Sequence, residues 1–185
     1  MSALPAIALA ICATPVLAQT GLGANGLDTK FVQMAMQSDS TEIEQARAEM
    51  QASHNPSVQL YARTIVKDHT AASSQLAAIA QSLNISYPDS HVQANTPDST
   101  GTPPPAATNA ATPSMSPTAF FNGQVKAHNE AILLFQNEAN NGGSAQLRRY
   151  AADTLPTLKA HLAMAQQYLA SGTISPEATP TPPGS

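Results

Sequence analysis

The chain has 185 residues, of which 11% are charged, with 15 prolines, one cysteine, no tryptophan and a formal net charge of −4. Eight Lys and Arg residues are too few for the basic surface that a nucleic-acid partner requires, and a single cysteine cannot form a disulfide within the chain. Because proline disrupts helices, the positions of the prolines decide whether this composition can form an ordered domain.

The N-terminal segment has the pattern of an export signal. Residues 2–18 are apolar and uncharged, and they end in small or modest side chains at the positions that a signal peptidase reads. We therefore predict a signal peptide, residues 1–18, that is cleaved after Ala18 and directs the protein to the periplasm. At about 17 residues the stretch is short for a bilayer span, which needs ~20. Bulky Ile11 before Cys12 disfavours a lipid anchor.

Most of the other prolines lie in two segments with few aliphatic side chains, residues 84–115 and 172–185. Such segments cannot bury enough apolar surface to order themselves, so we predict a disordered linker and a disordered Pro/Thr-rich tail. Residues 19–27 are predicted to be a flexible N-terminal segment. His91 belongs to the linker and is assigned no role. The ordered domain is therefore expected within residues 28–171.

Four segments in this domain carry apolar residues at helical spacing between start and stop signals. Asn-Pro and Ser-Pro pairs mark two of the starts, and Pro156 is expected to kink the fourth segment. Long helices joined by tight turns predict an all-α four-helix bundle with the long Pro-rich linker between the second and third helices. The linker is long enough for the third helix to run antiparallel or parallel to the second. The predicted helices are about 29–53, 56–83, 117–140 and 144–171.

Three histidines occupy core positions in the apolar stripes of the last three helices. His69, His128 and His161 each stand where the alternation of three and four residues expects a buried side chain. Glu42 lies on or near the inner face of the first helix. With a rise of about 1.5 Å per residue, Glu42 and His69 share a layer about 16–18 Å from the first turn. His128 lies about 20 Å and His161 about 25 Å from the second turn, unless the Pro156 kink reduces this difference.

These four residues allow two interpretations. Three imidazoles and a carboxylate can bind a transition metal such as Zn, Cu or Fe. The sequence favours the alternative, a structural polar network in which each histidine donates to a carbonyl or carboxylate. Nearby carboxylates that could accept are Asp68, Glu130 and Asp153.

Other kinds of metal or catalytic site have weaker support in the sequence. The Glu-x-x-His signature of di-iron bundles is absent, because Val66, Val125 and Leu158 stand three residues before the histidines. Methionines can bind Cu(I), but methionine at helical spacing is more often core filler. No triad, glycine-rich phosphate loop or cysteine pair is present, so we assign no catalytic residue and no cofactor other than a transition metal. The candidate soft ligands are Met34, Met36 and Met50.

The residues around Glu42, Asp68-His69-Thr70 and His128, together with the run TLPTLKAH at 154–161, resemble the domain-of-unknown-function family 4142. This is a group of exported bacterial proteins, often described as outer-membrane proteins and grouped with ferritin-like bundles. The resemblance covers roughly residues 29–171. It implies a ferritin-like four-helix fold and export. It implies no activity, because the family has none established.

Two functions therefore stay open. The first is a non-enzymatic periplasmic module, associated with the envelope or with stress, whose histidines are structural. It would have no nucleic-acid partner, no membrane span in the mature protein and at most a peripheral contact with the envelope. The second is a ferritin-like metal-binding or redox protein that uses Glu42, His69, His128 and His161.

Overall fold

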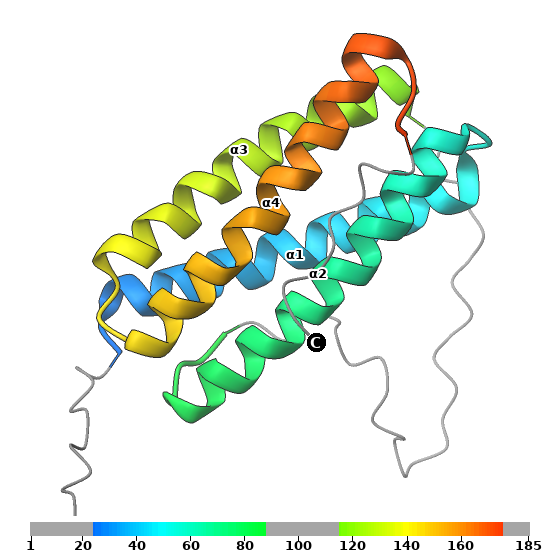
Figure 1. The fold of residues 1–185 in the computed structure, drawn as a ribbon. Coiled ribbons are helices and arrows are strands. Elements are labelled where there is room, and N and C mark those ends of the chain that lie inside the picture. The colour runs from blue at the N-terminus through cyan, green and yellow to red at the C-terminus, as the bar shows by residue number, and fades with distance from the viewer. Residues whose placement is uncertain (1–23, 88–114, 176–185) are drawn as a thin grey trace, which may run out of the picture.

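The computed structural model describes residues 24–87 and 115–175, and within them the chain forms four long helices and no strand (Figure 1). This confirms the predicted all-α four-helix bundle. The predicted signal peptide with its cleavage site at Ala18, Cys12, His91 and most of the linker and tail lie outside the described residues. The helices are α1 (Gly26–Ala52), α2 (Pro56–Ser82), α3 (Pro117–Asn141) and α4 (Ala145–Ser171).

The four helices form two antiparallel hairpins, α1–α2 and α3–α4, that pack against each other (Figure 1). Across the hairpins, α2 contacts α4 and α1 contacts α3. The backbone N–H of Ser144, in the α3–α4 turn, donates to Asp28 near the start of α1. At the other end of the bundle, Asn55 in the α1–α2 turn donates to Tyr168 near the end of α4. Neighbouring helices are therefore all antiparallel, and α3 runs parallel to α2.

This direction of α3 settles what the sequence left open. Ser82, at the end of α2, bonds Gln146 beside the α3–α4 turn. The backbone N–H of Met115, just before α3, donates to Glu49 near the end of α1. The chain between α2 and α3 therefore connects opposite ends of the bundle, which is the connection of ferritin-like folds.

Each helix is preceded by an N-cap residue whose side chain accepts from backbone N–H groups of the first turn. These residues are Asn25, Asn55, Ser116 and Ser144. Helix α1 begins at Gly26, earlier than the predicted start at about residue 29. Asn25 accepts from the N–H groups of Leu27 and Asp28, and the carboxylate of Asp28 accepts from the N–H of Asn25, which completes a capping box. α4 continues through Pro156 and ends at Gly172, whose φ of 76° suits glycine.

The linker and the tail both begin with residues that pack on the bundle, which differs from the predicted boundaries at 84 and 172. Ile85 is buried in the core, and its N–H donates to the carbonyl of Ala80. Ile174 is also buried, and its N–H donates to the hydroxyl of Ser57. A single isoleucine in a polar segment has no periodicity, so the pattern of neighbouring residues could not reveal its burial.

The core divides into two apolar clusters that are separated along every helix by a polar layer. The cluster nearer the α3–α4 turn includes Phe31, Leu76, Phe135 and Tyr150. The cluster nearer the α1–α2 turn surrounds Tyr61 and includes, among other side chains, Ile65, Phe120, Phe121 and Met164. The buried residues Asp39, Glu42, His69, Ser73, His128 and His161 lie between these clusters in sequence on each helix.

A pair of carboxyl groups closes one end of the bundle. Asp28 and Glu138 are both fully buried. Burial raises the pKa of Asp28, but the N–H groups of Asn25, Ser144 and Gly143 donate to its carboxylate and bring the pKa below its usual value. Burial, the hydrogen bond with Asp28 and the charge of Asp28 raise the pKa of Glu138 to about 8. Glu138 therefore keeps its proton near pH 7 while Asp28 is ionised.

This pair predicts that the contribution of Glu138 to stability falls as the pH rises above 4.5. Because the folded pKa of Glu138, about 8, exceeds its ordinary 4.5, its contribution to the free energy of unfolding is complete below pH 4.5 and is lost as the pH approaches 8. One proton contributes a slope of at most about 1.4 kcal/mol per pH unit. Glu138→Gln carries no such proton, so the stability of the wild type relative to this variant, measured as urea midpoints, should fall over this range. A variant as steep as the wild type would refute this.

Candidate metal centre

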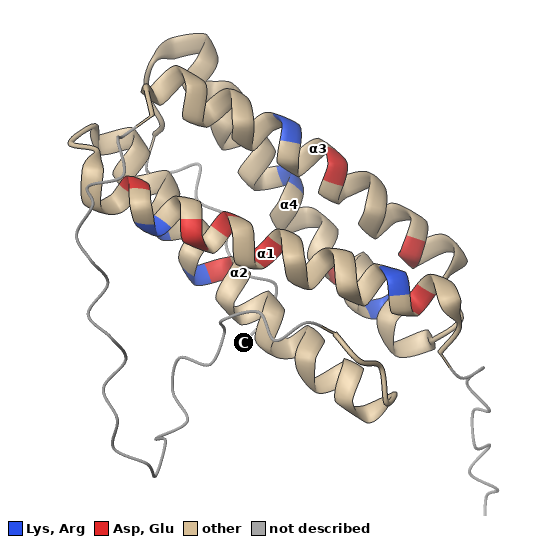
Figure 2. Cartoon of the chain, turned by 180° about the vertical axis from the view of Figure 1, so that it is seen from behind, with Lys and Arg blue, Asp and Glu red and all other residues tan. Residues whose placement is uncertain are grey.

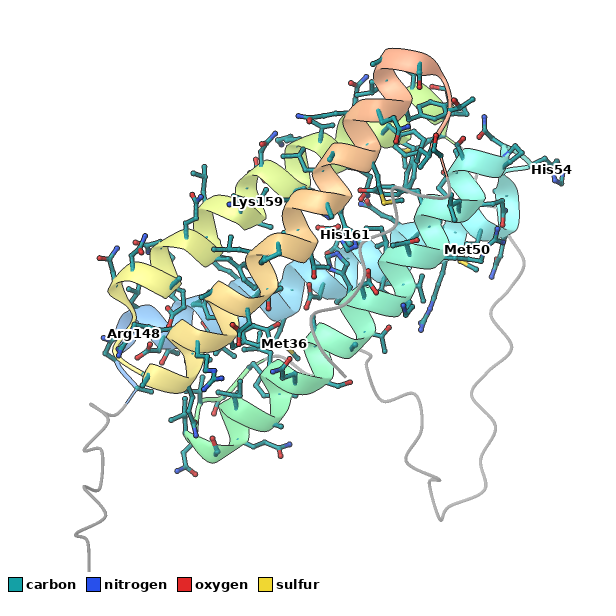
Figure 3. All side chains as sticks on the ribbon, in the orientation of Figure 1. Met36, Met50, His54, Arg148, Lys159 and His161 are labelled. Carbon is teal, nitrogen blue, oxygen red and sulfur yellow. The ribbon has the colours of Figure 1, made fainter. Side chains whose placement is uncertain are left out.

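The polar layer receives side chains from all four helices. Glu42 comes from α1, His69 from α2, His128 from α3 and His161 from α4, and their exposed fractions are 2%, 3%, 0% and 0%. His161 points from α4 into the interior of the bundle (Figure 3). The structure thus brings together all four residues that the sequence singled out, in a layer that solvent hardly reaches.

The spacing of these side chains approaches that of ligands around one ion. One ring nitrogen of each histidine can be chosen so that the three lie within 4.8 Å of one another. The Oε2 atom of Glu42 lies 3.6 Å from Nε2 of His69 and 3.6 Å from Nε2 of His128. Two ligands about 2.1 Å from a tetrahedral ion lie about 3.4 Å apart. A small contraction of the layer would therefore suffice to coordinate a metal.

Each imidazole has one nitrogen held by the protein. Nδ1 of His69 bonds Oδ1 of Asp39 at 2.8 Å, and Nε2 of His161 bonds Oδ2 of Asp68 at 3.0 Å. Nδ1 of His128 bonds the backbone carbonyl of Gln124 at 3.0 Å. Since these partners only accept, the bonded nitrogen carries the proton and the other nitrogen of a neutral ring keeps its lone pair. Metal-binding histidines are held in this way by carboxylates and carbonyls.

The atoms on the inner side of the layer have no hydrogen-bond partner. They are Nε2 of His69, Nε2 of His128, Nδ1 of His161 and Oε2 of Glu42, all of them buried. Buried polar atoms are nearly always hydrogen-bonded, so four atoms without a hydrogen bond in one layer require an explanation. A bound cation would give all four a partner at once.

Asp39 is the member of the layer that the sequence analysis missed. It is buried, and its second carboxylate oxygen accepts from the hydroxyl of Ser73 at 2.7 Å. Asp39 stands three residues after Met36 and three before Glu42, in the middle of the buried stripe of α1. This helical spacing was the sequence signal that could have predicted its burial. Of the carboxylates proposed as partners from the sequence, Asp68 does bond a histidine.

The prediction that Glu130 and Asp153 could accept from the core histidines was wrong. Glu130 pairs with Lys126 on the surface at 3.8 Å, and Asp153 pairs with Arg149 at 3.6 Å. In both pairs the partners stand four residues apart on one helix, with most of each side chain exposed. Basic residues one turn away attract these carboxylates outward, so nearness in sequence to a core histidine did not place them in the core.

The pKa values in this layer diverge because the charges lie close together. Burial lowers the pKa of His69, but its hydrogen bond with Asp39 and the charges of Asp39 and Glu42 raise it to about 9. Burial, followed by repulsion from His69 and His161, lowers the pKa of His128 to about 3. Burial also lowers the pKa of His161 and raises that of Glu42. His69 is thus the imidazolium of the metal-free layer, and His128 and His161 are neutral.

The three candidate methionines do not gather at this layer. Met34 is 47% exposed on the surface, whereas Met36 is buried in the apolar cluster nearer the α3–α4 turn. Met50 packs on the other cluster, and Figure 3 shows Met36 and Met50 on opposite sides of His161 along the bundle. The structure therefore offers no joint site for the three thioethers.

The protein is thus an all-α four-helix bundle in which three histidines and a glutamate, one from each helix, are buried in one layer. Residues 13–168 match the family described as Domain of unknown function (DUF4142), and the chain belongs to this family. None of the described helices is long and apolar enough to cross a membrane.

Solved structures of similar fold include CopM in the Cu(I)-bound form, which is 19% identical with a TM-score of 0.57. The match covers 77% of this chain and 96% of that one. CopM in the Ag-bound form, obtained by soaking, is also 19% identical, with a TM-score of 0.56 and coverage of 78% and 96%. At this identity the likeness shows a shared bundle fold. No curated protein sequence matches the chain.

Proposed function

We propose that this protein binds one transition-metal ion through His69, His128, His161 and Glu42. The observation that carries the proposal is that the three histidines each offer a ring nitrogen within 4.8 Å of the others, in a layer where Nε2 of His69, Nε2 of His128, Nδ1 of His161 and Oε2 of Glu42 are buried without a hydrogen-bond partner. Leaving one buried polar group unsatisfied costs about 1–3 kcal/mol. The structural network that the sequence favoured is the competing interpretation. Within it the imidazolium of His69 pairs with Glu42 at 3.6 Å, while Nε2 of His128 and Nδ1 of His161 stay without a hydrogen-bond partner.

Three imidazole nitrogens and one carboxylate oxygen can bind Zn(II), copper or Fe(II). The structures of similar fold are Cu(I)-bound and Ag-bound forms, which makes copper the first metal to test. Four ligands around one ion leave no position for a substrate, as in structural zinc sites and unlike catalytic ones. We therefore propose that the protein holds or carries the metal, with no catalytic reaction at this layer.

We place this activity in the periplasm, after export and cleavage behind Ala18. The apolar, uncharged stretch at residues 2–18 supports this proposal. The bundle itself has no cysteine, because the single one is Cys12. A site built from imidazoles and a carboxylate therefore needs no reduced thiol, which suits an oxidising compartment.

Metal titration of protein purified without a histidine tag tests the proposal. We expect one equivalent of Cu(I) or Zn(II) to bind in competition with a chromophoric chelator. At a free-metal concentration of 100 times Kd, binding should stabilise the fold by about 2.7 kcal/mol, seen as a higher melting temperature. His54→Gln is the matched control, since His54 is exposed at the end of the bundle (Figure 3).

The competing interpretation gives a different result. If the purified protein and the titrated protein both hold less than about 0.1 equivalent of metal, and neither metal changes the melting temperature, the histidines are a structural network. The same conclusion would follow if His54→Gln removed the bound metal and His128→Gln did not, because binding would then occur at the surface.

A further inference from the structure

A surface groove between α1 and α3 reaches the polar layer at one residue. The groove has a volume of about 800 Å³. Its lining includes Met34 and Ser38 on α1 and Gly123 and Ala127 on α3, and Glu42 lies at its inner wall. Among the four proposed metal ligands, only Glu42 lines it. The carboxylate of Glu42 therefore lies between this surface and the histidines.

The groove exists because the facing residues are small. Gly123 and Ala127 stand one helical turn apart on α3, and a Cβ atom added at Gly123 would meet no other atom within 4 Å. On α1 the residue one turn before Glu42 is Ser38, whose hydroxyl donates to Oε1 of Glu42 at 3.4 Å. Oε2 of the same carboxylate faces His69 and His128. One side chain thus connects the groove to the cluster.

Two other boundaries of the layer differ from the groove. The two apolar clusters cover it along the bundle axis. On the side of α2 and α4, the nearest surface group is Asp68, whose side chain is 17% exposed. Asp68 is occupied by its hydrogen bond with His161 and lies 3.8 Å from the ammonium group of Lys67. A cation that approached this side would first meet a positive charge.

We propose that the metal ion reaches the histidines through the α1–α3 groove and that Glu42 is the first protein ligand it meets. This proposal rests on the metal-binding function proposed above. Lys126 and Glu130 lie on the rim as an exposed ion pair. Figure 2 shows that α3 carries both basic and acidic residues. The ammonium group of Lys126 repels an arriving cation, whereas the carboxylates of Glu130 and Glu42 attract it.

A bulky side chain in the groove tests the route. Gly123→Phe should slow both the association of Zn(II) and its release to excess chelator by at least about tenfold. Kd should stay unchanged, because a plug raises the barrier and alters neither end state. Ala127→Leu provides a second, smaller obstruction. Ala163→Phe is the control, since Ala163 is exposed on α4 two residues after His161 and does not line the groove.

Charge on the rim gives an independent test with a matched control. Lys126 stands two residues before His128, as Lys67 stands two residues before His69. Lys126→Gln should speed association about two- to threefold at low ionic strength, with the gain lost at high salt. Lys67→Gln should leave the association rate unchanged, because Lys67 does not line the groove.

Stopped-flow mixing and chelator-driven release measure both rates, and circular dichroism checks the fold of each variant. If the wild type binds no metal, the proposed function itself fails. If the wild type binds metal and the folded Gly123→Phe and Ala127→Leu variants load it at the wild-type rate, the route is wrong and the metal site stands. An equal gain in rate from Lys67→Gln and Lys126→Gln would also overturn the route.

Discussion

Replacing His128 with leucine is expected to weaken metal binding strongly and to stabilise the metal-free protein. His128 is fully buried and neutral, and its Nε2 atom has no hydrogen-bond partner. Its Nδ1 proton bonds the carbonyl of Gln124, one turn earlier on α3, and in a helix that carbonyl also accepts the backbone N–H four residues on. Leucine removes the unsatisfied nitrogen and leaves the carbonyl bonded.

The gain in the free energy of unfolding should be about 1 kcal/mol. An unsatisfied buried group costs about 1–3 kcal/mol, and leucine, which is bulkier than histidine and differs from it in shape, recovers only part of this cost. Metal affinity should fall by at least about 100-fold, because one of the four ligands is lost. Urea denaturation of the metal-free protein and chelator competition measure the two effects. A structural role for His128 predicts the opposite pattern, a loss of stability in the metal-free protein, and that outcome would refute the proposed function.

Replacing Asp39 with alanine is expected to destabilise the protein by about 3 kcal/mol, the cost of removing one partner of a buried ion pair. The carboxylate of Asp39 accepts from His69 at 2.8 Å and from Ser73 at 2.7 Å, and its charge helps to raise the pKa of His69. Without it, the imidazole of His69 loses its nearest partner and the hydroxyl of Ser73 loses its acceptor. Asp153→Ala, at an exposed carboxylate paired with Arg149, should change stability by less than about 0.5 kcal/mol.

The same variant tests how Asp39 acts on the metal. Because Asp39 orients His69 and does not itself face the centre of the layer, metal affinity should fall by about 10–100-fold without being abolished. A double-mutant cycle with His69→Gln separates the pairwise contribution from the two single effects. If the effects of the two substitutions on stability simply add, the 2.8 Å contact contributes nothing and the proposed role of Asp39 is wrong.

The helices and three of their four starts could be predicted from the sequence because capping and periodicity are local. Asn55, Ser116 and the Asn-Gly-Gly turn before Ser144 each bound a stretch of regular apolar spacing. Asn25 was missed because the first turn of α1 has few apolar residues. The direction of α3 depends on how the two hairpins pack, and that information is spread over contacts such as Asp28 to Ser144 and Asn55 to Tyr168.

The convergence of the histidines was predicted, but their depths were not. Counting residues placed His161 about one turn deeper than His128, and yet the three rings share one layer. In a helix every Cα–Cβ bond tilts toward the helix N-terminus. α3 and α4 are antiparallel, so His128 leans away from the α3–α4 turn and His161 leans toward it, and the two rings approach each other. Side-chain direction thus corrects what the rise per residue alone predicts.

The division of the ligands between the hairpins has a consequence for assembly. The α1–α2 hairpin supplies Glu42 and His69, and the α3–α4 hairpin supplies His128 and His161. An ion at this layer would act as a non-covalent cross-link between the two halves of the molecule. The free energy that holds the two hairpins together would then increase with the concentration of free metal around the protein.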